Sequence, residues 1–178
     1  MKIVEMILAA GFGNRLKPLT DRVPKPLIKI GRETIIEKHL RNLKKANITN
    51  VVINVSHLAE KIMKKIGDGS DYGLKIIYSH EKERPLETLG GILNAIELFK
   101  EADHLIVVNS DDWCDYDFQH ISLPGNGNKA HLILVPNTNK EKPEGDFGIN
   151  KNKIDVSSKT RYTYSGLSCI ELNSLRNL

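Results

Sequence analysis

The chain has 178 residues, 40% of them hydrophobic and 27% charged, with a formal net charge of +4. This composition indicates a globular chain and excludes a disordered or membrane one, and no apolar run reaches the roughly 20 residues of a membrane-spanning helix. The excess of lysine and arginine is mild and dispersed, so it suits a small anionic ligand and argues against nucleic acid or a membrane as a partner. Cys114 and Cys169 lack metal-type spacing and indicate reduced thiols in a cytoplasmic protein.

Apolar runs alternate with helical patterns over the first two thirds of the chain. The N-terminal run leads directly into glycines, so it predicts a first strand and not a secretion signal. Strands are predicted at residues 2–10, 51–56, 74–79 and 104–110, and helices at residues 33–47, 58–66 and 89–100. Strands joined by helices of this length predict βαβ units with right-handed crossovers. We therefore expect an α/β fold in which helices cover both faces of a mostly parallel sheet.

The pattern changes after about residue 120. A loop, a strand, a polar connection, a hairpin and a last strand are predicted at residues 122–130, 131–136, 137–148, 147–156 and 161–172. The hairpin turns between Asn150 and Asn152. Because the chain shows no internal repeat, low-complexity tract or linker, residues 1–178 are expected to form one domain.

Unusual residues follow three of the predicted strands. They are residues 9–15 after the first strand, residues 81–91 after the third, and Asp111 after the fourth. Ligands of open α/β sheets bind beyond the carboxyl ends of the strands, so we expect these three segments to converge on one site.

The segment after the first strand predicts an anion site. Gly11 and Gly13 would let backbone N–H groups approach a phosphate, although glycines in this pattern can also form a plain turn. The dinucleotide fingerprint fails because Leu16 replaces its third glycine, and no P-loop sequence follows. Lys25 lies between two prolines, which hold its backbone on a stiff segment.

This stretch, "LAAGFGNRLKPLTDRVPKPL", resembles the signature L-A-A-G-x-G-T-R-L-x-P-L-T…P-K-P of the sugar-nucleotide pyrophosphorylases. Asn14 stands where that family usually has threonine or serine. Downstream, "PLETLGGI", "NSDDWCDYDF", "EGDFGI" and "RYTYSG" resemble the N-acetylmuramate-1-phosphate uridylyltransferases, with Leu89 and Ser110 at positions where glycine is usual. The resemblance runs from Met1 to about Leu172 and implies a Rossmann-like, three-layer αβα nucleotidyltransferase fold with a mixed, mostly parallel sheet.

The resemblance implies nucleotidyl transfer. A sugar 1-phosphate oxygen attacks the α-phosphorus of UTP and pyrophosphate leaves, a step that belongs to peptidoglycan recycling in the uridylyltransferase subgroup. The implied catalytic residues are Arg15 on the triphosphate, Lys25 between the two phosphates, and Asp111 as a ligand of Mg²⁺. Asp112 is expected to face away, because successive strand residues point in opposite directions. Without the resemblance, a turn or N-cap role for Asp111 would stay open as the alternative.

Two further sets of residues are implied to bind the substrates. The nucleotide set is Leu8, Ala10, Gly11, Gly13, Asn14, Glu81, Thr88 and Gly90. The sugar-phosphate set is Lys25, Gly145, Asp146 and Gly166. Thr88 could instead be a plain helix N-cap, and Asp146 could be a turn residue.

Family members usually continue beyond this point with a second metal-binding aspartate in a "D-V-G-T"-like stretch. No aspartate follows Asp155, which lies in the predicted hairpin, so we expect that either the chain is truncated or one carboxylate must suffice for the metal. Two functions stay open: an active uridylyltransferase, or a nucleotide- or sugar-phosphate-binding protein with little turnover. Within the enzyme class the alternative is a guanylyl- or thymidylyltransferase acting on mannose or glucose 1-phosphate. The sequence indicates no oligomeric state.

Overall fold

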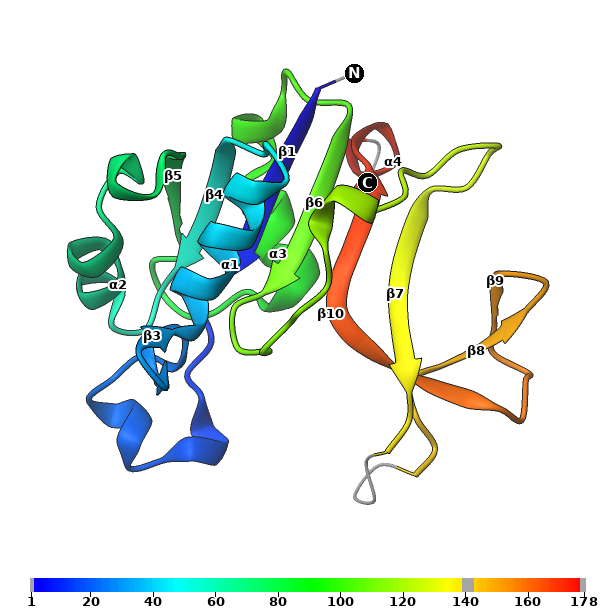
Figure 1. Cartoon of the computed structure of the whole chain (residues 1–178), viewed down its shortest axis with the longest axis horizontal. Coiled ribbons are helices and arrows are strands. Elements are labelled where there is room, and N and C mark those ends of the chain that lie inside the picture. The colour runs from blue at the N-terminus through cyan, green and yellow to red at the C-terminus, as the bar shows by residue number, and fades with distance from the viewer. Residues whose placement is uncertain (1, 139–142, 177–178) are drawn as a thin grey trace.

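The computed structural model describes residues 2–138 and 143–176. An eight-stranded sheet forms its centre, with the strand order β5-β4-β1-β6-β10-β8-β9, and β7 also pairs with β10 (Figure 1). The strands are β1 (Ile3–Leu8), β4 (Asn50–Val55), β5 (Lys75–His80), β6 (His104–Asn109), β7 (Ala130–Pro136), β8 (Phe147–Asn150), β9 (Lys153–Asp155) and β10 (Arg161–Glu171). A separate two-stranded sheet joins β2 (Lys29–Ile30) to β3 (Glu33–Thr34).

One half of the large sheet is parallel and carries the predicted βαβ units. β1 pairs in parallel with β4 and β6, and β4 pairs in parallel with β5. After residue 120 the strands become antiparallel, since β10 pairs in that sense with β6, β7 and β8. The β8–β9 hairpin turns at Lys151 and Asn152, both with positive φ, as expected. The predicted Rossmann-like α/β architecture is confirmed.

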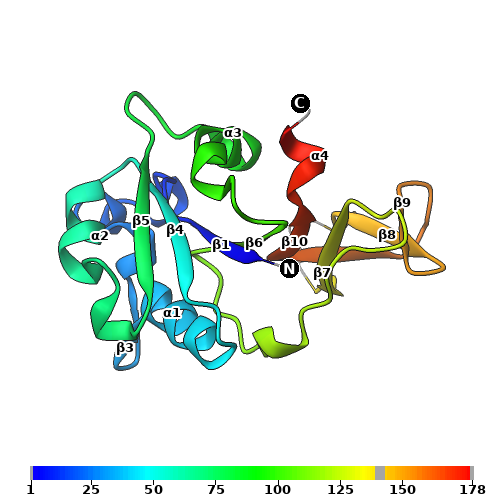
Figure 2. The ribbon, with the colours of Figure 1, turned by 90° about the horizontal axis from the view of Figure 1, so that it is seen from above.

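Helices cover both faces of the sheet. They are α1 (Ile35–Lys45), α2 (Ala59–Ile66), α3 (Glu87–Asn94) and the short α4 (Leu172–Arg176). α3 and α4 lie on one side and α1 on the other (Figure 2). α1 begins with a capping box, in which Thr34 and Glu37 bond reciprocally, and this arrangement satisfies two backbone N–H groups that the helix itself cannot.

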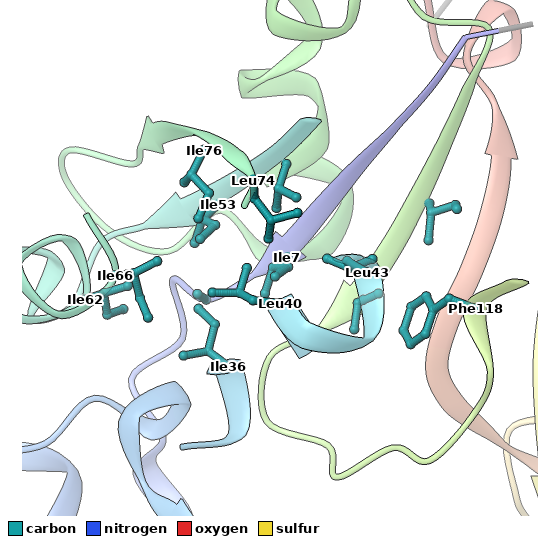
Figure 3. Close-up of a cluster of buried hydrophobic side chains, with 14 of the residues drawn as sticks. Ile7, Ile36, Leu40, Leu43, Ile53, Ile62, Ile66, Leu74, Ile76 and Phe118 are labelled. Atoms are coloured by element: carbon teal, nitrogen blue, oxygen red, sulfur yellow. The ribbon is translucent and has the colours of Figure 1, made fainter. Parts of the chain in front are cut away.

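The two cores follow from the alternation along the strands. In β1, Val4 and Met6 face α3, whereas Ile7 faces α1. Figure 3 shows the second of these cores, where the apolar stripes of α1 and α2 pack on β1 and β4. The helical members of that core are Ile36, Leu40, Leu43, Ile62 and Ile66, each buried. Full burial of one such side chain contributes roughly 1.5–3 kcal/mol, so these stripes fix both helices against the sheet.

The prediction of one helix over residues 89–100 is wrong. α3 ends at Asn94, and a 3₁₀ turn, Ile96–Phe99, follows it. The Asn94 amide donates to Ser79 Oγ at 3.0 Å, and the Ala95 N–H is shared between the carbonyls of Gly91 and Ile92. This tightening ends the α-helix and turns Phe99 into the core, where it is 1% exposed. Within residues 2–138 and 143–176, no helix combines the length and apolarity that crossing a membrane requires.

Candidate active site

A cleft of about 830 Å³ opens at the carboxyl ends of the parallel strands. Leu8, the last residue of β1, pairs with Asn54 on β4 and with Asn109 on β6, so these strand ends lie in one row. The structure brings together the three segments expected to converge. The predicted site residues that line the cleft are Leu8, Ala10, Gly11, Gly13, Asn14, Arg15, Lys25, Glu81, Thr88 and Asp111.

The two glycines of the first loop have different local environments. Gly13 has φ +67°, and an added Cβ would lie 2.8 Å from Thr20 Cγ2, so a larger residue would push the loop away from the segment that carries Lys25. An added Cβ at Gly11 would meet no atom within 4 Å, so the backbone there is open toward the cleft. The Thr20 hydroxyl donates to the Gly13 carbonyl at 2.9 Å and fixes this fold of the loop.

Lys25 and Asp111 form an ion pair at the wall of the cleft. Lys25 begins a 3₁₀ turn, Lys25–Leu27, between Pro24 with φ −61° and the buried Pro26. Its Nζ donates to Asp111 Oδ2, and the two side chains are 21% and 33% exposed. The proline-held lysine therefore points inward. When substrates bind, a phosphate could replace Asp111 as the partner of the Lys25 ammonium group. A cation could likewise replace Lys25 as the partner of the Asp111 carboxylate.

Asp112 does not line the cleft, but strand alternation is not the reason, because Asp111 and Asp112 lie in the turn that follows β6. Its carboxylate accepts from Asn109 Nδ2 at 3.2 Å, and burial, with the neighbouring charge of Asp111, raises its pKa. The Asp112 carbonyl lies 2.9 Å from Nε2 of the buried His39. Because a carbonyl only accepts, Nε2 carries the proton, and burial lowers the pKa of His39. His39 thereby anchors the turn that presents Asp111.

Asn54 belongs to the site although the sequence analysis missed it. Its Oδ1 accepts from the Ala9 N–H at 2.7 Å, and its Nδ2 donates to Glu81 Oε1 at 2.7 Å. The Leu86 N–H donates to the other oxygen of Glu81, also at 2.7 Å. Asn54 and Glu81 are each 3% exposed. The available signal was a polar residue near the end of the apolar run "VVINV", where a cleft was expected.

Other lining residues were also missed, among them Phe12, Arg84, Asn109 and Ser110. Phe12 is 45% exposed and packs beside His57, with ring centroids 5.5 Å apart. The Ser110 N–H donates to the Leu8 carbonyl at 3.1 Å, which ties the turn before Asp111 to the first strand. Phe12 and Arg84 lie in two of the segments that were expected to converge, but the sequence carried no signal that singled out these side chains within them.

Four predicted residues do not line the cleft: Gly90, Gly145, Asp146 and Gly166. Gly145 packs on Arg161, and the Asp146 carboxylate accepts from the N–H of Tyr164 in β10 at 2.8 Å, so it ties the start of β8 to β10 and does not cap a local turn.

Gly166 is different. It lies at the irregularity of β10 with φ +78°, and an added Cβ would lie 2.8 Å from Asn109 Nδ2. It therefore contacts the turn that carries Asp111.

Gly90 lies inside α3, where an added Cβ would lie 3.0 Å from Leu86 Cβ. Thr88 lines the cleft at the second position of that helix, whose N-cap is Leu86 and not Thr88. The roles of all these residues in ligand binding stay predictions.

The metal prediction rests on Asp111 alone. In the part of the chain that the structure describes, no three His, Cys, Asp or Glu side chains gather as a ligand group. Asp155, in β9, accepts from the Ser157 N–H at 2.9 Å and is part of the hairpin, as expected. A hard cation at this site would need oxygen ligands from its substrates, which is how Mg²⁺ binds in many phosphate-transfer sites.

The sequence and the fold both match known nucleotidyltransferases. The profile of the family described as "Nucleotidyl transferase" matches residues 4–159. An N-acetylmuramate alpha-1-phosphate uridylyltransferase of Neisseria meningitidis serogroup B is 41% identical over 170 residues, which cover 91% of this chain and 72% of that protein. A mannose-1-phosphate guanyltransferase of Debaryomyces hansenii is 37% identical over 134 residues, which cover 73% of this chain but only 37% of that protein.

The fold agrees with a solved structure at lower sequence identity. HddC from Yersinia pseudotuberculosis, complexed with GMP-PN, has a TM-score of 0.79 and 22% identity, and the match covers 100% of this chain and 80% of HddC. At that identity the likeness concerns the fold alone. Because the family profile spans most of the chain and the meningococcal relative matches nearly all of it, the chain belongs to the nucleotidyl transferase family and is a sugar-nucleotidyltransferase by descent.

Proposed function

We propose that this protein couples a sugar 1-phosphate to UTP, giving a UDP-sugar and pyrophosphate, with N-acetylmuramate 1-phosphate as the sugar substrate. The observation that carries the proposal is the Lys25–Asp111 pair, held in the same cleft as the glycine loop and Glu81. The choice of sugar is supported by the 41% identity to a relative with that substrate in its name. The proposed setting is peptidoglycan recycling in the cytoplasm.

In the proposed reaction an oxygen of the sugar phosphate attacks the α-phosphorus of UTP. A new P–O bond forms, the bond between the α-phosphorus and the bridging oxygen breaks, and the electron pair leaves with pyrophosphate. No covalent intermediate with the protein is needed, so the protein acts by positioning and by neutralising charge. The Lys25 ammonium contacts both reacting phosphates, the open amides near Gly11 bind the nucleotide, and Arg15 binds the leaving pyrophosphate.

Asp111 fits Mg²⁺ as one carboxylate beside bound phosphates. Its carboxylate is partly exposed, and its partner in the protein is Lys25. When the nucleotide enters, the lysine ammonium group can pair with a phosphate instead and so free the carboxylate for the metal. When bound, Mg²⁺ would withdraw charge from the α-phosphate and orient it for attack. The turn that holds Asp111 is fixed by His39 and by the contact of Ser110 with Leu8.

The base preference follows from Glu81. A carboxylate only accepts hydrogen bonds, and it has about four acceptor sites, of which protein N–H groups occupy two here. A carboxylate oxygen placed against the ring nitrogen of the pairing edge favours uracil, thymine and guanine, whose ring nitrogen there carries a proton, over cytosine and adenine, whose ring nitrogen there only accepts. Guanylyl and thymidylyl transfer would both satisfy the same base preference, so both stay open as alternatives. The similarity to a mannose-1-phosphate guanyltransferase supports guanylyl transfer as the alternative.

A nucleotide panel tests the proposal. Pyrophosphate release is measured with UTP, dTTP, GTP, CTP and ATP at equal concentration, each with N-acetylmuramate, mannose or glucose 1-phosphate, with Mg²⁺ or with EDTA. We expect release with UTP and N-acetylmuramate 1-phosphate that EDTA abolishes. Faster release with GTP and mannose 1-phosphate would refute the substrate assignment. Tight UTP binding without release from any pair would identify a binding protein instead of a transferase.

A further inference from the structure

We propose that Asn54 is the positioning residue for base selection, because it holds the Glu81 carboxylate at a fixed position relative to the glycine loop. The inference rests on the proposed function, since it names how that site would choose its nucleotide. Asn54 lies near the end of β4, between β1 and β5, and its one amide group bridges two segments that both line the cleft, the loop after β1 and the loop after β5.

The chemistry of the two partners fixes the orientation of the Asn54 amide. The Ala9 N–H can only donate, so it must face Oδ1, and a carboxylate can only accept, so Glu81 must face Nδ2. Both bonds are 2.7 Å long, and both side chains are almost fully buried. A buried amide with both ends satisfied has no alternative arrangement of equal energy, so Glu81 is held in one position.

The other oxygen of Glu81 is held by a different segment of the chain. The Leu86 N–H donates to Oε2 at 2.7 Å, directly before α3 begins. The carboxylate is therefore clamped between β4 and the loop that enters α3, and both of its oxygens keep acceptor capacity for a ligand. Because Asn54 also holds Ala9, any shift of the first loop would move Glu81 with it.

Gly91 supplies the room for this arrangement. An added Cβ at Gly91 would lie 2.7 Å from Glu81 Oε1 and 2.9 Å from Asn54 Nδ2. The glycine lies inside α3 and has no positive φ, so its backbone conformation does not require glycine. The close approach of the Asn54–Glu81 pair gives a physical reason for the second glycine of the "LGGI" segment.

The decisive variant is Asn54→Asp. It keeps the oxygen that accepts from Ala9 but sets a carboxylate oxygen against Glu81 Oε1, and two carboxylates at that spacing repel or share a proton. Glu81 then leaves its position or becomes protonated and donates a hydrogen bond. The first change removes the acceptor for uracil N3–H, and the second supplies a donor for cytosine N3, so both favour cytosine relative to uracil. A merely structural role for Asn54 would weaken all nucleotides alike and would not change their ratio.

The test measures the dissociation constants of UTP and CTP with Mg²⁺ by calorimetry for the parent protein and three variants. We expect the parent to prefer UTP, and Asn54→Asp to reduce the UTP-to-CTP preference by about tenfold, the usual scale for disturbing one buried charged hydrogen bond. Gly91→Ala should reduce the preference in the same direction, although alanine is the better helix former.

Asn94→Asp is the matched control, because Asn94 bonds to Ser79 just before Glu81 but does not line the cleft. It should keep the parental ratio. A parental ratio in Asn54→Asp would overturn the inference. A parent that binds UTP and CTP equally would refute both the inference and the base preference. A parent that discriminates in binding but releases no pyrophosphate would refute only the proposed transfer reaction, since the binding ratios still decide the role of Asn54.

Discussion

Glu5 offers a sharp test of the energetics of the core. It lies in β1 between Val51 and Ile106, it is 0% exposed, and neither carboxylate oxygen has a hydrogen-bond partner among the described residues. Burial raises its pKa well above the ordinary value of 4.5. The folded state thus keeps the proton at pH values where the unfolded chain has lost it. Above pH 4.5 the folded state binds more protons, so stability falls by about 1.4 kcal/mol per pH unit until the folded pKa is reached.

Glu5→Met removes the carboxyl group and keeps an unbranched side chain of similar size. The unmade hydrogen bonds of the buried carboxyl cost about 1–3 kcal/mol, so the variant should be more stable by that amount near pH 4.5, with an advantage that grows as pH rises. Urea unfolding at about pH 5, 6, 7 and 8 measures this difference, where the linkage applies. Glu5→Gln is the control, because it keeps a buried polar group but cannot ionise, so it should lose the pH slope. A stability gap between parent and Glu5→Met that stays constant with pH would refute the reasoning.

Three further predictions concern the site and α1. Asp111→Ala should abolish Mg²⁺-dependent pyrophosphate release while the circular dichroism spectrum and the unfolding transition persist; undiminished release would remove the metal assignment. Lys25→Ala should raise the KM for the sugar phosphate more than the Kd for UTP, and the opposite order would mean that the lysine serves the nucleotide alone. Burial opposes ionisation of Glu37, but hydrogen bonds from Lys65, Thr34 and Tyr72 lower its pKa to about 2. The stabilising effect of ionised Glu37 is therefore complete above pH 4.5 and is lost as pH falls toward 2. In unfolding experiments, Glu37→Gln should lose less stability than the parent over this acid range. An unchanged loss in the variant would contradict this prediction.

The structure of the first two thirds of the chain was predictable because helix and strand formation there follows patterns among residues that are near neighbours in the sequence. Apolar periodicity located α1, α2 and the four parallel strands, and the glycine loop could be placed at a strand end before any contact was known. Convergence of the three strand ends then followed from the topology of parallel sheets. The split of the third helix was not predictable, because it depends on the bond from Asn94 to Ser79 across to β5.

The α/β class, the position of the anion loop and the family signature could all be predicted from the sequence, since each depends on residues near one another in the chain. Which polar groups meet is visible only in the folded chain. Lys25 and Asp111 are 86 residues apart, and Ala9 and Asn54 are 45 apart, so their contacts depend on the order and register of the strands. The same dependence places Asp146 against the backbone of β10 and Gly166 against the turn of Asp111. Side chains from distant segments become neighbours only when the sheet has formed, and that step is non-local.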